Sequence, residues 1–251
     1  KLGANPYKLG FIGGTDNHNG APSDVDEATY NGSHGPADGT IEERRGGAID
    51  GWVNGPDANP GSIAGVWAPK NTRGAIFDAM QARETFVTSG PRIKPRFFSG
   101  QALNATDDPV RMVMDGYANG VPMGGTLTAL EGPPSFTVHA RKDPEGANLD
   151  RIQIIKGWVD EKGNAQERIF DVAVSDGRAI NAEGRCTVAV GNTVNVEAAT
   201  YENSIGAAEL MASWVDPDFD PTLPALYYTR TLEIPTPRWT TYDAVRFGEP
   251  L

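Results

Sequence analysis

The sequence has little cysteine, little histidine and no long apolar run. Its single cysteine, Cys186, has no partner for a disulfide within the chain. No run approaches the ~18 apolar residues that a membrane-spanning helix needs, so no transmembrane segment is predicted. Three histidines are too few for a self-contained site that binds several metal ions through imidazole groups. A disulfide framework, a membrane span and a complete imidazole-rich cluster are therefore excluded.

An excess of positive charge and the common catalytic motifs are also missing. The 33 acidic residues outnumber the 22 basic ones, which gives a formal net charge of −11. A charge of this sign argues against nucleic acid or an anionic membrane as the main partner. The sequence has no Gly-x-Ser-x-Gly elbow, no P-loop and no dinucleotide fingerprint. No recognisable motif flanks Cys186 either. Hydrolases with a nucleophile elbow, P-loop nucleotide-binding proteins, dinucleotide-dependent enzymes and cysteine hydrolases are therefore excluded.

The first quarter of the chain combines one apolar run with a long polar stretch. Residues 9–14 are mostly apolar, end in glycines and are interpreted as a buried strand of an α/β unit. Thr15-Asp16-Asn17-His18 follows at the end of this strand, where ligand-binding residues of α/β proteins collect. Residues 19–68 are rich in Gly, Pro, Asn and Asp, which predicts a long ordered loop anchored by Trp52 and Trp67.

The next segment predicts a helix, a short strand and a turn. Residues 71–83 have an apolar face at helical spacing, and Asn71 or Thr72 can cap the helix. Residues 85–88 are typical of a short strand that Ser89-Gly90-Pro91 ends. Arg92 comes directly after this turn. It either meets an anionic substrate or pairs with a surface acid, and the sequence does not choose between the two.

From residue 92 onward the pattern is that of a β protein. Apolar side chains alternate with polar ones, and turn signals separate the runs, which favours an antiparallel sandwich or Greek key. We expect two domains, with residues 1–91 forming a metal-site region and residues 92–251 a β-rich, sandwich-like domain of an α+β protein. The predicted strands are 92–98, 111–114, 135–141, 150–157, 167–174, 193–198, 207–215 and 225–233.

Asp16 and His18 are the candidate metal ligands. Separated by one residue at a strand end, their carboxylate and imidazole can turn toward one cation. The alternative is an ordinary turn in which Asp16 accepts hydrogen bonds from backbone N–H groups. His34, in the long loop, is a candidate for a further ligand or a substrate contact, or is an exposed loop residue. His139 lies on the polar face of a strand and is interpreted as an exposed or hydrogen-bonded sheet residue. Further candidate carboxylates, equally consistent with solvated loop charges, are Asp24, Asp26 and Glu27.

The segment from Asn5 to His18 resembles the last metal-ligand segment of a large bacterial family known as domain of unknown function 3604. That family is similar to the PHP (polymerase and histidinol phosphatase) metallohydrolases. Three further stretches carry the resemblance over nearly the whole chain. They are residues 66–69 with 73–92, residues 96–98, and residues 212–239 with the Asp216-Pro217-Asp218-Phe219-Asp220 and Pro235-Thr236-Pro237-Arg238-Trp239 signatures.

The resemblance implies the C-terminal part of a PHP-like β/α barrel, with a divalent metal such as Zn, Mn or Fe bound by Asp16 and His18. The early His-x-His motif of PHP proteins is absent, so the other ligands are expected in a missing N-terminal part of the same protein. The implied function is that of a metal-dependent, phosphoesterase-like hydrolase acting on a small anionic substrate, inactive in this fragment alone. A non-enzymatic β-sandwich module for binding or assembly on a degenerate PHP-like scaffold is the alternative. A periplasmic or secreted bacterial protein is expected.

Overall fold

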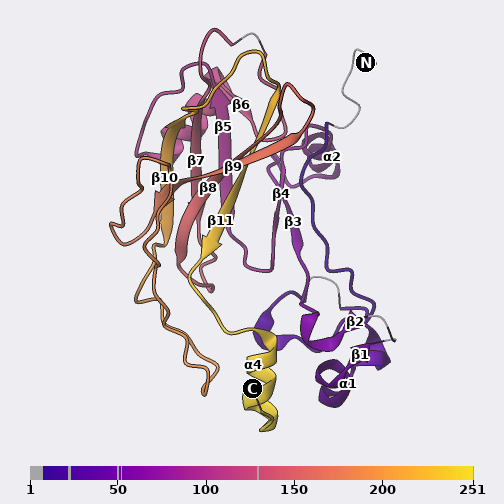
Figure 1. Ribbon diagram of the computed structural model, residues 1–251. Helices are drawn as coiled ribbons and strands as arrows, with labels where there is room; N and C mark the ends of the chain where they lie inside the picture. Colours follow the sequence, from indigo (N-terminus) through magenta and orange to yellow (C-terminus); the bar gives the residue numbers. More distant parts are fainter. Residues whose placement is uncertain (1–7, 22–23, 50, 52, 129, 251) are drawn as a thin grey trace.

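The computed structural model describes residues 8–21, 24–49, 51, 53–128 and 130–250. It contains a two-sheet β-sandwich, a smaller lobe beneath it, and a hairpin with a helix at one side (Figure 1). With 3-10 helices labelled η, the elements in chain order are η1 (Glu27–Thr29), η2 (Gly35–Asp38), α1 (Ile41–Gly46), β1 (Ala48–Ile49), β2 (Val53–Asn54), η3 (Gly55–Asp57), β3 (Ile63–Val66), α2 (Arg73–Gln81), β4 (Thr85–Thr88), β5 (Lys94–Gly100), α3 (Pro109–Asn119), β6 (Val121–Pro122), β7 (Ser135–Arg141), β8 (Leu149–Val159), β9 (Ala165–Val174), β10 (Glu209–Val215), β11 (Ala225–Glu233) and α4 (Trp239–Phe247).

The sandwich consists of two antiparallel sheets, one ordered β10-β7-β5-β6 and the other β11-β8-β9. Alternate residues of each strand face the opposite sheet. Phe136, Val138 and Ala140 of β7 are at most 2% exposed, and they form one core with Ile152 and Ile154 of β8. Each of the Phe, Val and Ile side chains contributes about 1.5–3 kcal/mol through burial. The predicted antiparallel sandwich is therefore confirmed, within a mixed α and β protein.

Most of the strands predicted after residue 91 are confirmed, but the strand predicted at residues 111–114 is wrong. These residues lie within α3, which packs on the outer face of the first sheet. The side chain of Asp108 accepts hydrogen bonds from the backbone N–H groups of Val110 and Arg111, and Pro109 occupies the first turn. An Asp cap followed by Pro is a helix-start signal. It outweighs the β propensity of the Arg-Met-Val-Met run that follows.

The predicted strand 193–198 is also wrong. Only an isolated bridge joins Asn195 to Thr200 in this stretch. Asn192 and Asn195 instead accept hydrogen bonds through their side chains from nearby backbone N–H groups, at Val194 and Ala198. Such local bonds compete with a sheet ladder for the same backbone groups, so the segment forms turns.

Residues 9–14 do not form the predicted buried strand. Leu9 is 80% exposed and Ile12 is 62% exposed. The segment is extended but joins no ladder, and it crosses the β3–β4 hairpin through side-chain bonds such as that from Thr85 Oγ1 to the Phe11 carbonyl, at 2.6 Å. The hairpin strands pair with each other, and the segment is attached beside them by the Ser62 and Thr85 side chains and by a backbone bond from Ser62 to the Gly14 carbonyl rather than by a ladder. In the described part of the chain, no sheet closes into a barrel.

The predicted helix and strand after the long loop are confirmed as α2 and β4. The side chain of Thr72 caps α2 by accepting the N–H of Ala75. Trp67 anchors the end of the loop as predicted: its indole donates to the Pro95 carbonyl at 2.9 Å, and its ring lies against the Arg96 guanidinium. Trp52, the other predicted anchor, lies outside the described residues.

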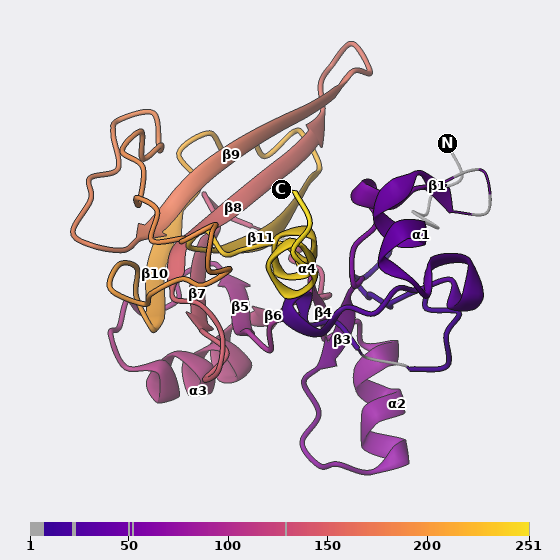
Figure 2. The ribbon, with the colours of Figure 1, turned by 90° about the horizontal axis from the view of Figure 1, so that it is seen from below.

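The smaller lobe brings the C-terminal helix to residues 24–58 (Figure 2). Trp239 is 1% exposed and packs against the ring of Tyr30. The Arg44 guanidinium of α1 donates to the Asp243 carboxylate of α4 at 2.7 Å, and both side chains are buried. The C-terminal segment thus packs back on the N-terminal part. The division into two domains at residue 91 stays a prediction, and these contacts join the two predicted domains.

Candidate functional site

The Thr15–His18 segment forms a tight turn that holds two of the candidate ligands. Asp16 has a left-handed φ of 52°, which costs less for Asp than for most residues because its short side chain can bond locally. The distance between His18 Nε2 and Asp16 Oδ1 is 3.5 Å. Gly61 lies against this turn, and a Cβ there would stand 2.6 Å from Thr15 Cα. The turn therefore depends on a glycine about 45 residues away.

The structure brings His34 to this turn. The backbone N–H of His18 donates to the Ser33 carbonyl at 2.7 Å, and Asn19 Nδ2 donates to the Gly32 carbonyl at 2.5 Å. The two imidazole rings lie 5.3 Å apart between centroids. Three of the four predicted site residues, Asp16, His18 and His34, therefore gather in one place.

Asp38 and Ser33 set the orientation of His34. The ring nitrogen Nδ1 lies 2.9 Å from Ser33 Oγ and 3.6 Å from Asp38 Oδ2. Asp38 is 0% exposed and also accepts the backbone N–H groups of Ser33 and His34. A carboxylate behind one ring nitrogen is the arrangement by which proteins orient metal-binding histidines. Asp38 was not among the candidate site residues predicted from the sequence, although its place four residues after His34 was a usable signal.

The cluster of Asp16, His18 and His34 is partly open to solvent and is an incomplete set of metal ligands. The side chains of His18 and Asp16 are 57% and 97% exposed, whereas that of His34 is 12% exposed. Over the described residues, no three His, Cys, Asp or Glu side chains converge as a metal site. The predicted pair and its neighbour thus supply donors of suitable chemistry without closing a coordination sphere.

The other candidate carboxylates have structural roles. Asp26 caps η1 by accepting the N–H of Ala28 at 2.8 Å, and Asp24 Oδ1 accepts the Thr29 hydroxyl at 3.4 Å. Glu27 accepts the backbone N–H of Trp239 at 2.6 Å. Burial raises the pKa of Glu27 above its usual range, an effect that this hydrogen bond partly opposes. These three acids therefore hold the small lobe together.

Arg92 is apart from the histidines. It is exposed, and its backbone N–H donates to Asp143 Oδ2 at 2.7 Å. No described contact joins Arg92 to Asp16 or His18. The structure therefore leaves its predicted role in substrate binding as a prediction.

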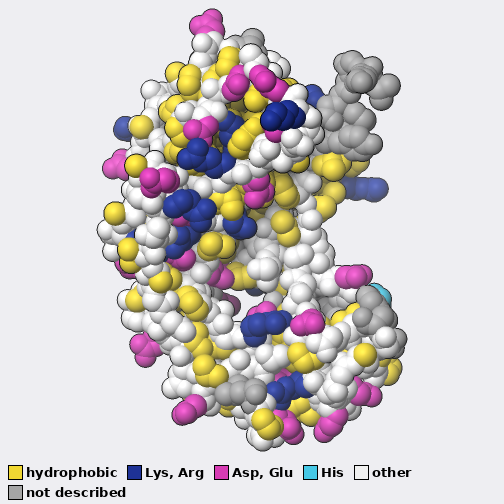
Figure 3. Space-filling view, viewed as in Figure 1, with side chains coloured by type: hydrophobic (Ala, Val, Ile, Leu, Met, Phe, Trp, Pro, Cys, Tyr) yellow, Lys and Arg dark blue, Asp and Glu magenta, His cyan; other side chains and the backbone are white. Residues whose placement is uncertain are grey.

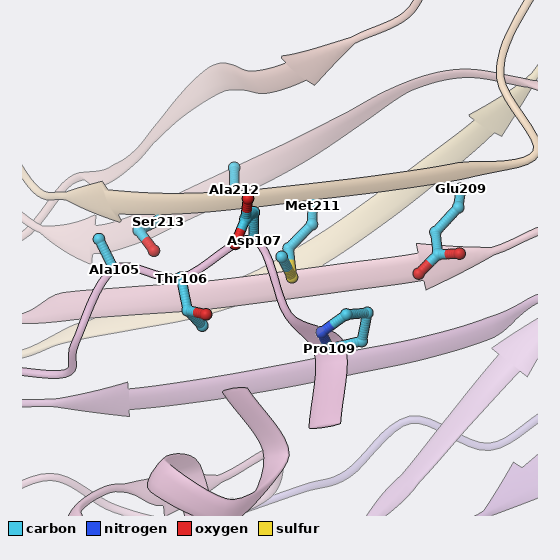
Figure 4. Close-up of a pocket in the computed structure, with 8 residues that line it drawn as sticks. All are labelled: Ala105, Thr106, Asp107, Pro109, Glu209, Met211, Ala212 and Ser213. Atoms are coloured by element: carbon cyan, nitrogen blue, oxygen red, sulfur yellow. The ribbon is translucent and has the colours of Figure 1, made fainter. Parts of the chain in front are cut away.

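His139 is a hydrogen-bonded sheet residue, as predicted. Its Nε2 lies 2.6 Å from Glu209 Oε1. Glu209 borders a hollow of about 440 Å³ between β10 and the segment before α3, together with Asp107, Met211 and Ser213 (Figure 4). This hollow lies on the outer face of the first sheet, away from the Asp16 turn.

The molecule is thus a mixed α and β protein with an antiparallel sandwich and an exposed turn, holding Asp16 and His18, against which the largely buried imidazole of His34 lies. The family model described as "Protein of unknown function (DUF3604)" matches residues 1–251. The chain therefore belongs to the DUF3604 family, which confirms the resemblance seen in its sequence. No curated protein and no solved structure matches it. None of the described helices is long and apolar enough to cross a membrane.

Proposed function

We propose that this chain is the C-terminal part of a PHP-like, metal-dependent hydrolase of phosphoester-type substrates. Asp16 and His18 would bind a divalent metal ion, and His34 would be a third donor. The observation that supports the proposal is the proximity of these side chains, Asp16 beside His18 and His18 beside His34, which come from two segments of an otherwise irregular region. The backbone hydrogen bond from His18 to Ser33 joins the two segments and so holds His34 near His18. Unrelated residues of a solvated loop would not need such a bond.

The donor set fits the metals expected from the sequence. One carboxylate and two imidazoles suit Zn, Mn or Fe, and Asp38 gives His34 the supporting carboxylate that such ligands usually have. A bound ion would polarise a phosphoryl oxygen and lower the pKa of a bound water. The remaining ligands, and the barrel they stand on, would come from an N-terminal part of the same protein. Arg92 is proposed as a contact for an anionic substrate.

Calorimetric titration of this chain with zinc and with manganese tests the ligand assignment. We expect weak binding, because three donors that do not converge leave most of the coordination sphere to water. Asp16→Ala and His18→Ala should each abolish the heat of binding. His139→Gln is the matched control, since its imidazole pairs with Glu209 in the sandwich. Sub-micromolar binding that persists in Asp16→Ala would show that the metal binds elsewhere.

The alternative is a non-enzymatic sandwich module for binding or assembly. It differs from the hydrolase proposal because it predicts that the complete protein has no hydrolytic activity. A hydrolase of this family should cleave bis(p-nitrophenyl) phosphate with added manganese or zinc, and Asp16→Ala should remove that activity. If both proteins are equally inactive over a range of divalent metals, the hydrolase proposal fails. The tryptophans in the described part form no exposed row: Trp239 is buried, and Trp214 packs against Phe136 and Phe170.

A further inference from the structure

The inner face of the β11-β8-β9 sheet continues beyond the hydrophobic core. In this sheet, residues paired across neighbouring strands point to the same face. Ile154 pairs with Phe170 inside the core. The next row on the same face holds Arg168, Lys156 and Tyr227. Figure 2 shows the β8–β9 ribbon extending past the strands of the other sheet, and Lys156 of this row donates to Asp216, the residue just after β10 ends, so the row lies at the end of the sandwich.

A cavity of about 260 Å³ occupies this opening. The Lys156 and Tyr227 row lines one part, and Trp158, one step further along β8, lines another. The segment after β10 closes the remaining side with Asp218 and Asp220. The face that is purely apolar in the core thus becomes aromatic and charged at the cavity.

The charged groups of the cavity are held in fixed positions. Lys156 is 4% exposed, and its Nζ donates to Asp216 Oδ2 at 2.7 Å and to the Asp218 carbonyl at 2.6 Å. The Tyr227 hydroxyl donates to Asp216 Oδ2 at 2.6 Å. Burial, and then the adjacent Asp216 carboxylate, raise the pKa of Tyr227, so its hydroxyl stays protonated. Arg168 forms an ion pair with Asp218.

Burying the charged side chains of this row costs desolvation free energy, whereas apolar side chains at the same positions would extend the hydrophobic core. A buried ion pair stabilises a fold no more than apolar side chains of similar volume, because each charge loses its hydration. The row is also preorganised, which lowers the entropy lost when a ligand binds. Stability alone therefore does not account for the Lys156–Asp216 pair.

We propose that this cavity binds a neutral sugar ring of a carbohydrate. Trp158 and Tyr227 line the cavity beside Lys156, so it offers aromatic rings to the C–H groups of a pyranose, and the charged side chains around them offer donors and acceptors to its hydroxyls. Three carboxylates, those of Asp216, Asp218 and Asp220, stand against two cations, which disfavours an anionic ligand. A volume of about 260 Å³ is just below the ~300–1,000 Å³ typical of drug-sized ligands, so one ring fits and longer chains extend outside.

The proposal does not depend on metal binding at Asp16, because it rests only on the sandwich. Calorimetry on the whole chain tests it, with neutral hexasaccharides of glucose, mannose, galactose and xylose as probes and with an oligoglucuronate as the anionic comparison. We expect at least one neutral hexasaccharide to bind and the oligoglucuronate not to bind. If no neutral probe binds, or if only the anionic one does, the proposal is overturned.

Three tryptophan variants locate the binding. Trp158→Ala should weaken binding of the neutral probe at least about tenfold, as loss of an aromatic anchor does. Trp158→Phe, which keeps an aromatic ring, should restore part of the affinity. Trp67→Phe is the control, since Trp67 contacts Phe86 and Arg96 outside the cavity, and it should bind as the parent does. Unchanged binding by a Trp158→Ala protein with a native circular dichroism spectrum overturns the assignment.

Discussion

Glu233 should make the stability of this protein fall as the pH rises through neutrality. It is the last residue of β11, where the chain leaves the sandwich for the small lobe. Its Oε1 is buried without a hydrogen-bond partner among the described residues. Burial, reinforced by the nearby Asp143 carboxylate, raises the pKa of Glu233 from 4.5 to about 7.

The sign and size of the effect follow from proton linkage. Since the pKa is higher in the folded state, the folded protein keeps a proton between pH 4.5 and about 7 that the unfolded chain releases. The stabilising effect of that proton is complete below pH 4.5 and is lost as the pH rises to about 7. At about 1.4 kcal/mol per pKa unit, the loss is about 3 kcal/mol in total, of which about 2.5 kcal/mol falls between pH 5 and 8.5.

Urea unfolding of the parent and of Glu233→Gln at half-unit steps from pH 5 to 8.5 measures this effect. Glutamine keeps the shape and neutral charge of the protonated acid, so the difference in unfolding free energy should move toward the variant by about 2.5 kcal/mol over this range. Comparing the two proteins cancels the other titrating groups. Asp143→Asn should shift the transition to lower pH, because it removes a neighbouring negative charge. A difference that stays constant from pH 5 to 8.5 would refute the reasoning.

Three further variants test other parts of the structure. Arg44→Ala should lower the free energy of unfolding by about 3–5 kcal/mol in urea melts, because Asp243 would stay buried without its main partner; a loss under 1 kcal/mol would contradict this. Asp108→Ala should cost about 1 kcal/mol by removing the cap of α3, whereas Asp108→Asn, which can still accept those bonds, should cost a few tenths. Gly61→Ala should disturb the Thr15 backbone and its own φ of 88°, and so weaken zinc binding in calorimetry more than Gly74→Ala, which has open space at its Cβ.

Local signals predicted much of the sandwich and of α2. Strands such as β7 can be predicted because their apolar and polar side chains alternate, and alternation with a period of two is typical of a strand with one buried face. The failure at residues 111–114 was also local. Asp108 and Pro109 form a helix-start signal in the sequence, and this signal prevails over the β propensity of the residues that follow.

The candidate site was only partly predictable. Asp16 and His18 are neighbours in the sequence, so their proximity in the structure was expected from spacing alone. His34 joins them because a backbone bond from His18 to Ser33 closes a loop, and no periodic pattern encodes such a contact. Asp38, by contrast, lies only four residues after His34, so this local contact could have been found from the sequence.

The residues alone identify the family, the positions of most strands after residue 91 and the closeness of Asp16 to His18. These depend on short-range spacing and on side-chain periodicity. Packing between distant segments sets the exposure of residues 9–14, the return of α4 to the small lobe, and the position of Lys156 at a cavity at the end of the core. Burial at each of these places depends on which distant segment covers the residue, and that is a property of the packed chain.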